Sequence, residues 1–262
     1  DCGTDYNYLI TANYGYHLEA IYLDGVLDQT FPYSETLYTT AFTRTVTNVM
    51  ADHQLDAVFA INTYTIDVTV GANGSVEPGD DVTLNHGDNA TFVVTPDPCY
   101  YISEVLVDGT DVLGADSTTF TYTFTNVVAP HTFEANFAIY EYEMTETHTG
   151  MGTVSTATVN CGDDYTYMID ADTANGYHIE SVTFNGVTTT YGNNEDIHAE
   201  QLVEAVSQDT TIDVVFAINT YSIDVTVNGN GTTTPGDTAG IIWDNNVDYT
   251  ITAEHGYHIA SV

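Results

Sequence analysis

The sequence repeats itself with a period of about 80 residues, which limits the chain to an array of small, similar folding units. One recurring segment reads NYGYHLEAIYLDGV from Asn13, DPCYYISEVLVDGT from Asp97, ANGYHIESVTFNGV from Ala174 and EHGYHIASV from Glu254. A second segment reads FAINTYTIDVTV from Phe59, FAIYEYEMTETH from Phe137 and FAINTYSIDVTV from Phe216. Two independent markers with the same period indicate a tandem repeat.

The two markers divide the chain into four segments: residues 1–61, 62–139, 140–218 and 219–262. The two middle segments are whole repeats. Residues 1–61 lack the opening hairpin of a repeat, and residues 219–262 contain only its opening half. Two hypotheses account for the partial segments. Either the sequence continues in a longer tandem chain, or the C-terminal strands of one molecule complete the N-terminal repeat of the next.

Each repeat has the residue pattern of β-strands. In TYTIDVTV, residues 63–70, apolar and aromatic side chains alternate strictly with polar ones, as in a strand with one buried face. Tight-turn dipeptides separate such segments at Asp24-Gly25, Asp108-Gly109 and Asn185-Gly186. Residues 194–208 have room for one or two helical turns, which we interpret as a local departure. We therefore predict an all-β fold, a tandem array of small antiparallel β-sandwich or β-grasp-like repeats of about 80 residues.

The passage from one repeat to the next contains no flexible linker. In FAINTYTIDV, residues 59–68, the last strand pattern of one repeat reaches the first of the next across two or three residues, without a spacer rich in Gly, Pro or Ser. Such a joint restricts rotation, so we expect a semi-rigid array. The alternative is a string of independent units that happen to be close.

The charge of the chain excludes several classes of partner. There are 38 acidic residues and a single basic one, Arg44, which gives a net charge of −37. Binding to nucleic acid or to an anionic membrane surface requires clustered Lys and Arg, which this chain does not have. No apolar run reaches the roughly 18 residues of a membrane span. The hydrophobic content of 43% nevertheless supports folded cores, and the acidity suits a cation-rich extracellular surface.

The succession of motifs resembles a known group of bacterial proteins. The order is GYHI followed by an Asp-Gly or Asn-Gly turn, then YTFTNV, a short polar gap and HTFEANFA. This order resembles the divergent relatives of the internalin B-repeat and Listeria–Bacteroides repeat families. The resemblance extends over essentially the whole chain and implies a long secreted or wall-attached protein, often an adhesin, stalk or spacer. It implies no catalytic residues.

The three cysteines are candidates for a covalent cross-link. Cys2 and Cys161 occupy the same column of the repeat, and Cys99 stands where the other repeats have glycine. No repeat has a cysteine in both columns, so a disulfide within one repeat is excluded. A link between repeats or between chains is one interpretation, free thiols are a second, and small buried apolar side chains are a third.

Other side chains give candidate sites without a specific motif. Asp80 and Asp81 are candidate calcium ligands, and calcium is the one cofactor that the sequence leaves open. The triplets that begin at Asn73, Asn89 and Asn230 are candidate glycosylation sites on a secreted chain. The histidines recur in fixed columns, which indicates structural positions. No zinc motif, nucleophile motif or phosphate loop is present, so we expect no catalytic residue.

These observations favour a non-enzymatic structural subunit or stalk of a bacterial extracellular surface fibre. Its partners would be further copies, added head to tail, or further repeats of a longer chain. One alternative is an adhesin segment that binds glycan or protein ligands through exposed aromatic and acidic loops. Another is an accessory module of a larger secreted enzyme, with the chemistry outside this sequence.

Overall fold

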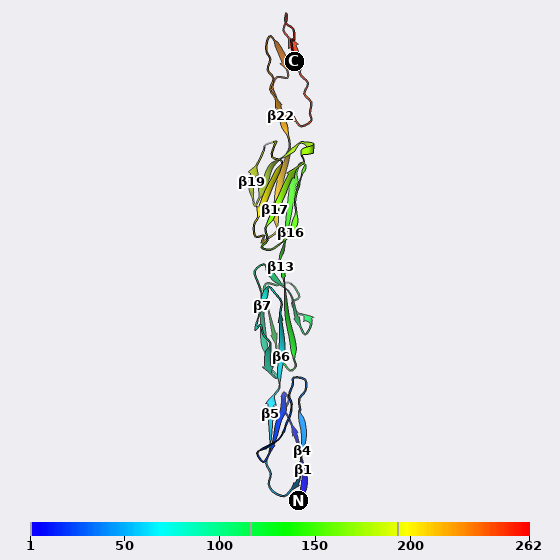
Figure 1. Cartoon of the computed structure of the whole chain (residues 1–262), viewed down its shortest axis with the longest axis vertical. Helices are drawn as coiled ribbons and strands as arrows, with labels where there is room; N and C mark the ends of the chain where they lie inside the picture. Colours follow the sequence, from blue (N-terminus) through cyan, green and yellow to red (C-terminus); the bar gives the residue numbers. More distant parts are fainter. Residues whose placement is uncertain (1, 116, 193) are drawn as a thin grey trace. The chain divides into compact units, whose positions relative to one another are not determined.

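The computed structural model describes residues 2–115, 117–192 and 194–262. The chain divides into two compact units, Asp1–Ile139 and Tyr140–Val262. Each unit is built from β-strands and contains one complete β-sandwich together with part of another (Figure 1). The all-β prediction is therefore confirmed.

The complete sandwich of the first unit has a five-stranded and a three-stranded sheet. Its strands are β6 (Thr63–Val70), β7 (Gly74–Glu77), β8 (Val82–Asn85), β9 (Ala90–Pro96), β10 (Tyr100–Val107), β11 (Thr110–Asp111), β12 (Phe120–Phe124) and β13 (His131–Ile139). The sheet orders are β11-β10-β13-β6-β8 and β12-β9-β7. Pairing is antiparallel except between β13 and β6, which run parallel. The last strand of the sandwich therefore lies beside its first.

The second unit contains a sandwich of the same topology. Its strands are β14 (Glu141–Thr149), β15 (Gly152–Val154), β16 (Ala157–Asn160), β17 (Tyr165–Ala171), β18 (Tyr177–Phe184), β19 (Val187–Thr190), β20 (His198–Val203) and β21 (Thr210–Ile218), with a 3₁₀ turn η1 (Thr173–Asn175). The sheet orders are β16-β14-β21-β18-β19 and β15-β17-β20, and β14 and β21 form the parallel pair. Strand β20 lies in the segment where the sequence left room for helical turns.

Each unit also contains a partial sandwich. The N-terminal one contains β1 (Thr4–Thr11), β2 (Tyr16–Leu23), β3 (Val26–Thr30), β4 (Ala41–Val49) and β5 (Leu55–Ile61), in the orders β3-β2-β5 and β1-β4. They correspond to β9–β13. The C-terminal one contains β22 (Thr220–Ile223), β23 (Gly231–Thr234), β24 (Thr238–Ile242) and β25 (Thr250–Ala253), paired as β22-β24 and β23-β25. They correspond to β6–β9.

The core of each complete sandwich lies between its two sheets. In the first unit, the fully buried Phe133 of the larger sheet stacks on Phe92 of the smaller one, with ring centroids 4.8 Å apart. The alternation of TYTIDVTV buries Tyr64 and Ile66 in the same cluster. Apolar surface removed from water stabilises the sandwich at about 25 cal/mol per Å², and these aromatic rings contribute a large share of that surface.

The second sandwich carries Tyr167 where the first has Phe92. Tyr167 is fully buried, and its hydroxyl donates to the carbonyl oxygens of Thr145 and Thr210 at 3.0 and 2.9 Å. Burial, followed by the charge of nearby Tyr165, raises the pKa of Tyr167 to about 12. The neutral hydroxyl therefore links both strands of the parallel pair from inside the core.

The predicted tight turns adopt the backbone conformation that their residues favour. Asp108 and Gly109 have φ values of 51° and 75°, and Asn185 and Gly186 have 49° and 76°. Positive φ at two successive residues matches the right-handed twist of the flanking strands, and Asp, Asn and Gly adopt it at low cost.

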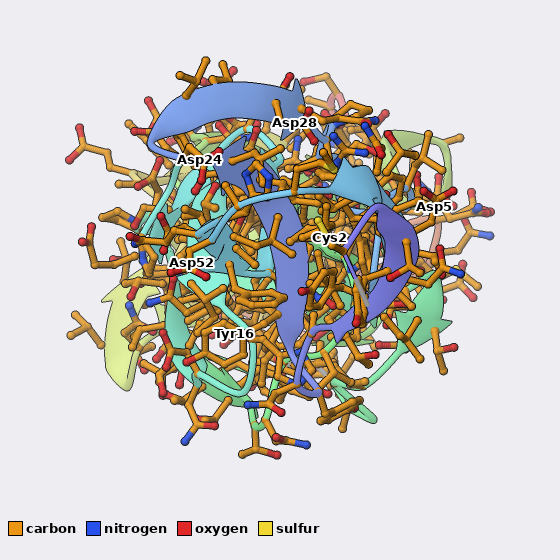
Figure 2. All side chains as sticks on the ribbon, turned by 90° about the horizontal axis from the view of Figure 1, so that it is seen from below. Cys2, Asp5, Tyr16, Asp24, Asp28 and Asp52 are labelled. Atoms are coloured by element: carbon orange, nitrogen blue, oxygen red, sulfur yellow. The ribbon has the colours of Figure 1, made fainter. Side chains whose placement is uncertain are left out.

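Acidic side chains of the N-terminal partial sandwich lie on more than one side of it. Figure 2 labels Asp24 and Asp28 toward the top of the view, Asp52 at the left and Asp5 at the right. The single cation, Arg44 on β4, donates from Nε and Nη2 to the Asp28 carboxylate at 2.5 and 3.1 Å. Across the described ranges, no helix has the length and apolar character needed to cross a membrane.

Replacing Phe133 by alanine should lower the free energy of unfolding by about 3–5 kcal/mol, because it removes a ring from the fully buried core and leaves a cavity. Urea denaturation of the whole chain measures this change. The control is Val93→Ala on β9, where the side chain is 42% exposed, with an expected change of about 0.5 kcal/mol or less. Equal losses in both variants would contradict the proposed core.

Candidate functional site at the joints between repeats

The joints are the parts of the chain where two successive repeats meet. Within the first unit β5 ends at Ile61 and β6 begins at Thr63, so Asn62 alone lies between them (Figure 1). Within the second unit Asn219 alone separates β21 from β22. The sequence predicted a joint of two or three residues, and the structure shortens it to one.

The backbone of Asn62 is hydrogen-bonded to both repeats. Its N–H donates to the carbonyl oxygen of Gly15 at 2.8 Å, and its own carbonyl oxygen accepts from the N–H of His86 at 2.8 Å. Gly15 belongs to the N-terminal repeat and His86 to the following one. One peptide segment therefore bridges the two repeats, and rotation about it breaks a buried hydrogen bond.

The side chain of Asn62 secures the same position. Asn62 and His17 are 2% and 5% exposed, and the Asn62 Oδ1 atom lies 2.9 Å from His17 Nδ1. A carbonyl oxygen only accepts, so Nδ1 of His17 carries the proton and donates it. The His17 ring also stacks on Tyr33, with centroids 4.1 Å apart, and Tyr33 Oη accepts from the N–H of Thr63 at 2.6 Å.

The second joint repeats this arrangement with different residues at its rim. The N–H of Asn219 donates to Gly176 at 2.7 Å, and its carbonyl accepts from Trp243 at 3.0 Å. The Asn219 Oδ1 atom lies 2.8 Å from Nδ1 of the buried His178. Two joints at different places in the chain therefore use the same Asn–His pair and the same two backbone bonds.

A glycine allows close packing at each of these joints. Gly15 and Gly176 have φ values of 83° and 74°, which favour glycine. A Cβ atom on Gly15 would lie 2.5 Å from the His86 ring, and one on Gly176 would lie 2.2 Å from Trp243. Only a hydrogen atom fits between the glycine of one repeat and the ring of the next.

The histidines at the other recurring position, His53 and His131, bind the aspartate of a turn and take no part in a joint. Asp24 accepts from the N–H of Gln54 at 2.8 Å and lies 2.7 Å from His53 Nδ1. The backbone hydrogen bond and then the histidine contact lower the pKa of Asp24. Asp108 has the same partners, with Thr132 N–H at 2.9 Å and His131 at 2.8 Å.

The candidate calcium ligands have a structural position. Asp80 and Asp81 are both exposed, and Asp81 Oδ1 accepts from the N–H of Val68 at 2.8 Å. Asp237 makes the equivalent contact with Val225 at 2.9 Å, so an aspartate accepts from the backbone N–H of the corresponding valine in both repeats. Within the described ranges, no three His, Cys, Asp or Glu residues are placed to hold a metal ion together. Calcium binding stays a prediction.

The candidate glycosylation sites all lie at turns. Asn73, Asn89 and Asn230 are exposed. The carbonyl oxygens of Asn73 and Asn230 accept from Asp97 and Glu254, and the Asn89 side-chain oxygen accepts from the N–H of Asn126 at 2.7 Å. The side-chain contact of Asn89 and the positive φ of 71° at Asn73 explain the asparagine at two of these turns without a glycan. Glycosylation stays a prediction.

The cysteines occupy the two recurring positions of the repeat whose residues contact each other at the joints. Cys99 has a φ of 69° and stands in the column of Gly15 and Gly176. Cys161 stands in the column of His86 and Trp243, and its N–H donates to the Tyr140 carbonyl. Cys2 is a free, exposed thiol whose Sγ lies 3.6 Å from Met50 Sδ. A covalent cross-link through these cysteines stays a prediction.

Sequence reasoning found the histidine columns and missed their partners. His17 and His178 stand at equivalent positions of their repeats. The asparagine of each joint is the last residue of the segment FAIN, which occurs at residues 59–62 and 216–219. Repetition of Asn and His together was the available signal. What the sequence did not show is that an asparagine after one strand reaches a histidine on another, because this contact depends on how β2 lies beside β5.

Comparison with known families gives one result. Residues 64–141 match the family model of the divergent InlB B-repeat domain. The predicted resemblance to the internalin B-repeat family is thereby confirmed for this segment, which covers the sandwich β6–β13. No curated protein sequence matches the chain.

Replacing Gly176 by alanine should displace the indole of Trp243 and shift its fluorescence emission, because the new methyl group overlaps the ring. Trp243 is the only tryptophan of the chain, so the signal has one source. Gly186→Ala is a matched control, since Gly186 has a φ of 76° and nothing within 4 Å of the added methyl group. Identical emission spectra in the two variants would contradict the packing of this joint.

Acid should destabilise the chain partly through Asp108. Burial opposes ionisation, but the hydrogen bonds from Thr132 and His131 outweigh it and lower the pKa of Asp108. A lowered folded-state pKa gives stability that is present above the unfolded value of about 4 and is lost as pH falls through the folded value.

Asp108→Asn should therefore lower the free energy of unfolding by about 1 kcal/mol at pH 7 and by less at pH 3. The loss is small because the carboxylate is half exposed and water screens its interactions. Asp67→Asn removes one exposed charge from the same repeat and serves as the control. Urea denaturation at both pH values measures the difference. A stability loss that is the same at pH 7 and pH 3 would rule out the proposed clamp.

Proposed function

We propose that the chain is a non-enzymatic structural spacer of the bacterial extracellular surface, a stalk or fibre subunit built from tandem β repeats. The observation that carries this proposal is the one-residue joint, hydrogen-bonded to the repeats on both sides at Asn62 and Asn219. A joint of this kind limits bending between neighbouring repeats, which is the property that a spacer requires.

The family match and the charge support an extracellular location. The InlB B-repeat domain at residues 64–141 is of a type that is typically surface-associated. A charge of −37 with a single cation destabilises a compact chain by self-repulsion, and abundant cations outside a cell screen that repulsion.

The topology supports a mechanical role as well. Tension enters the second repeat through the start of β6 and leaves it through the end of β13. These two strands are parallel neighbours, paired from His131↔Ile66 to Ala135↔Val70. Pulling on such a pair loads its hydrogen bonds together in shear, so that several must break at once.

The stiffness of the first joint can be measured by pulsed electron paramagnetic resonance. Spin labels can be attached to noncanonical amino acids that replace Leu27 and Val93, which are both exposed. Leu27 lies in the repeat before Asn62 and Val93 in the repeat after it, and this labelling leaves the cysteines unmodified. We expect a narrow distribution of label distances in the native chain and a broad one after a Gly-Ser linker is inserted between Asn62 and Thr63. A native distribution as broad as that of the linker variant would refute the spacer function.

A further inference from the structure

The two complete repeats, residues 62–139 and 140–218, carry tension through equivalent pairs of strands. The chain enters the repeat 62–139 at the start of β6 and leaves it at the end of β13, and it uses β14 and β21 in the same way in the repeat 140–218. Both pairs are parallel, and they begin at equivalent residues, Ile66↔His131 and Met144↔Thr210. Their ladders extend over five and six residue pairs, so the backbone alone gives the two repeats a similar resistance to shear.

Side chains add hydrogen bonds across the parallel pair in the repeat 140–218. Thr145 Oγ1 on β14 lies 2.7 Å from Thr211 Oγ1 on β21, and Thr147 Oγ1 donates to the Asp213 carboxylate at 2.8 Å. The two residues of each strand are two positions apart, so both bonds lie on the same face of the sheet. That face points to solvent, since all four residues are exposed.

The inner face of this pair is bridged as well. Tyr167 Oη shares its one hydrogen between the carbonyl oxygens of Thr145 and Thr210, at 3.0 and 2.9 Å. The Tyr167 side chain is fully buried, so water does not compete for this bond. At the start of the pair, the N–H of Glu143 donates to Asp209 Oδ1 at 2.9 Å. The strands β14 and β21 are therefore tied together on both faces.

The repeat 62–139 has different residues at the positions of two of these bridges. Phe92 stands where the other repeat has Tyr167, and Pro130 stands where it has Asp209. Neither side chain has a polar atom, so neither can form the corresponding hydrogen bond. The inner face and the start of this pair are held by the backbone ladder and apolar packing.

The outer face of β6 and β13 is not bridged either. Thr65 Oγ1 lies 3.2 Å from Thr83 Oγ1 on β8, and Glu134 accepts from Asn136 on its own strand at 3.0 Å. Among the residues that the structure describes, no hydrogen bond joins a side chain of β6 to one of β13. The two repeats thus share one topology and differ in what must break when their parallel strands slide apart.

We propose that, of the two complete repeats, the repeat 62–139 yields first under tension while the repeat 140–218 holds. Shear along β14 and β21 loads the side-chain bridges together with the backbone ladder, so more bonds must break at once. Unfolding of the weaker repeat lengthens the chain and limits the load on the stronger one. This inference rests on the proposed spacer function, because it supposes that the chain carries tension along its length.

Single-molecule force spectroscopy of the whole chain between two handle domains measures the order of unfolding. A thiol reductant is present throughout, so that no cysteine cross-link carries load. A Gly-Ser insertion in the turn Asn185-Gly186 lengthens the repeat 140–218 and marks its unfolding event, at a turn where Gly186 has nothing within 4 Å of an added methyl group. We expect the lengthened event at the higher force. Equal forces, or the reverse order, overturn the inference.

Tyr167→Phe tests the buried bridge. The variant should unfold the repeat 140–218 about tenfold faster at constant force, because the hydroxyl that ties Thr145 to Thr210 is lost. Tyr165→Phe is the matched control on the same strand. The Tyr165 hydroxyl donates to Ser155 Oγ at 2.9 Å, which lies outside the parallel pair, so its removal should change this rate by less than about twofold.

Urea denaturation separates resistance to force from stability at equilibrium. Each of the two variants loses one tyrosine hydroxyl bond, so we expect similar losses of stability and a difference under force alone. Equal acceleration of unfolding under force in both variants also overturns the inference. In that case a narrow label-distance distribution across Asn62 would leave the spacer function standing. A broad distribution would refute the spacer function whatever the order of unfolding.

Discussion

Asn62 and Asn219 each donate a backbone hydrogen bond to the repeat before and accept one from the repeat after. The geometry of both joints depends on this single residue, because strand follows strand without a segment in which the chain can turn. The buried contact with His17 or His178 then fixes the side chain as well. Where a linker would separate two folding units, here one peptide belongs to both of them.

The parallel pairing of first and last strands makes this joint possible. Because β13 lies beside β6, the chain enters and leaves the sandwich through adjacent strands of one sheet. The strand that closes one repeat therefore leads directly into the strand that opens the next. One topological rule thus underlies both the joint and the mechanical proposal.

Much of the fold could be predicted from the sequence, and the rest depended on contacts between distant residues. Strict alternation in residues 63–70 predicted β6, and Asp108-Gly109 predicted the turn between β10 and β11, because both are local effects of side-chain direction and backbone preference. The segment that contains β20 was ambiguous, since Ala199 and its neighbours acquire their strand pairing from β17. The parallel pair could not be predicted, because alternation does not tell which strand lies beside which. For the same reason the sequence showed the histidine columns without the asparagines that bind them.

Hydrogen exchange at the Asn62 and Asn219 amides, followed by nuclear magnetic resonance, tests the central claim most directly. Each amide donates to a carbonyl oxygen of the preceding repeat, so its exchange reports whether two successive repeats stay together. We predict protection similar to that of core amides such as the one of Phe133. Exchange as fast as that of an exposed loop would contradict the account, because it would show that the repeats separate freely at their joints.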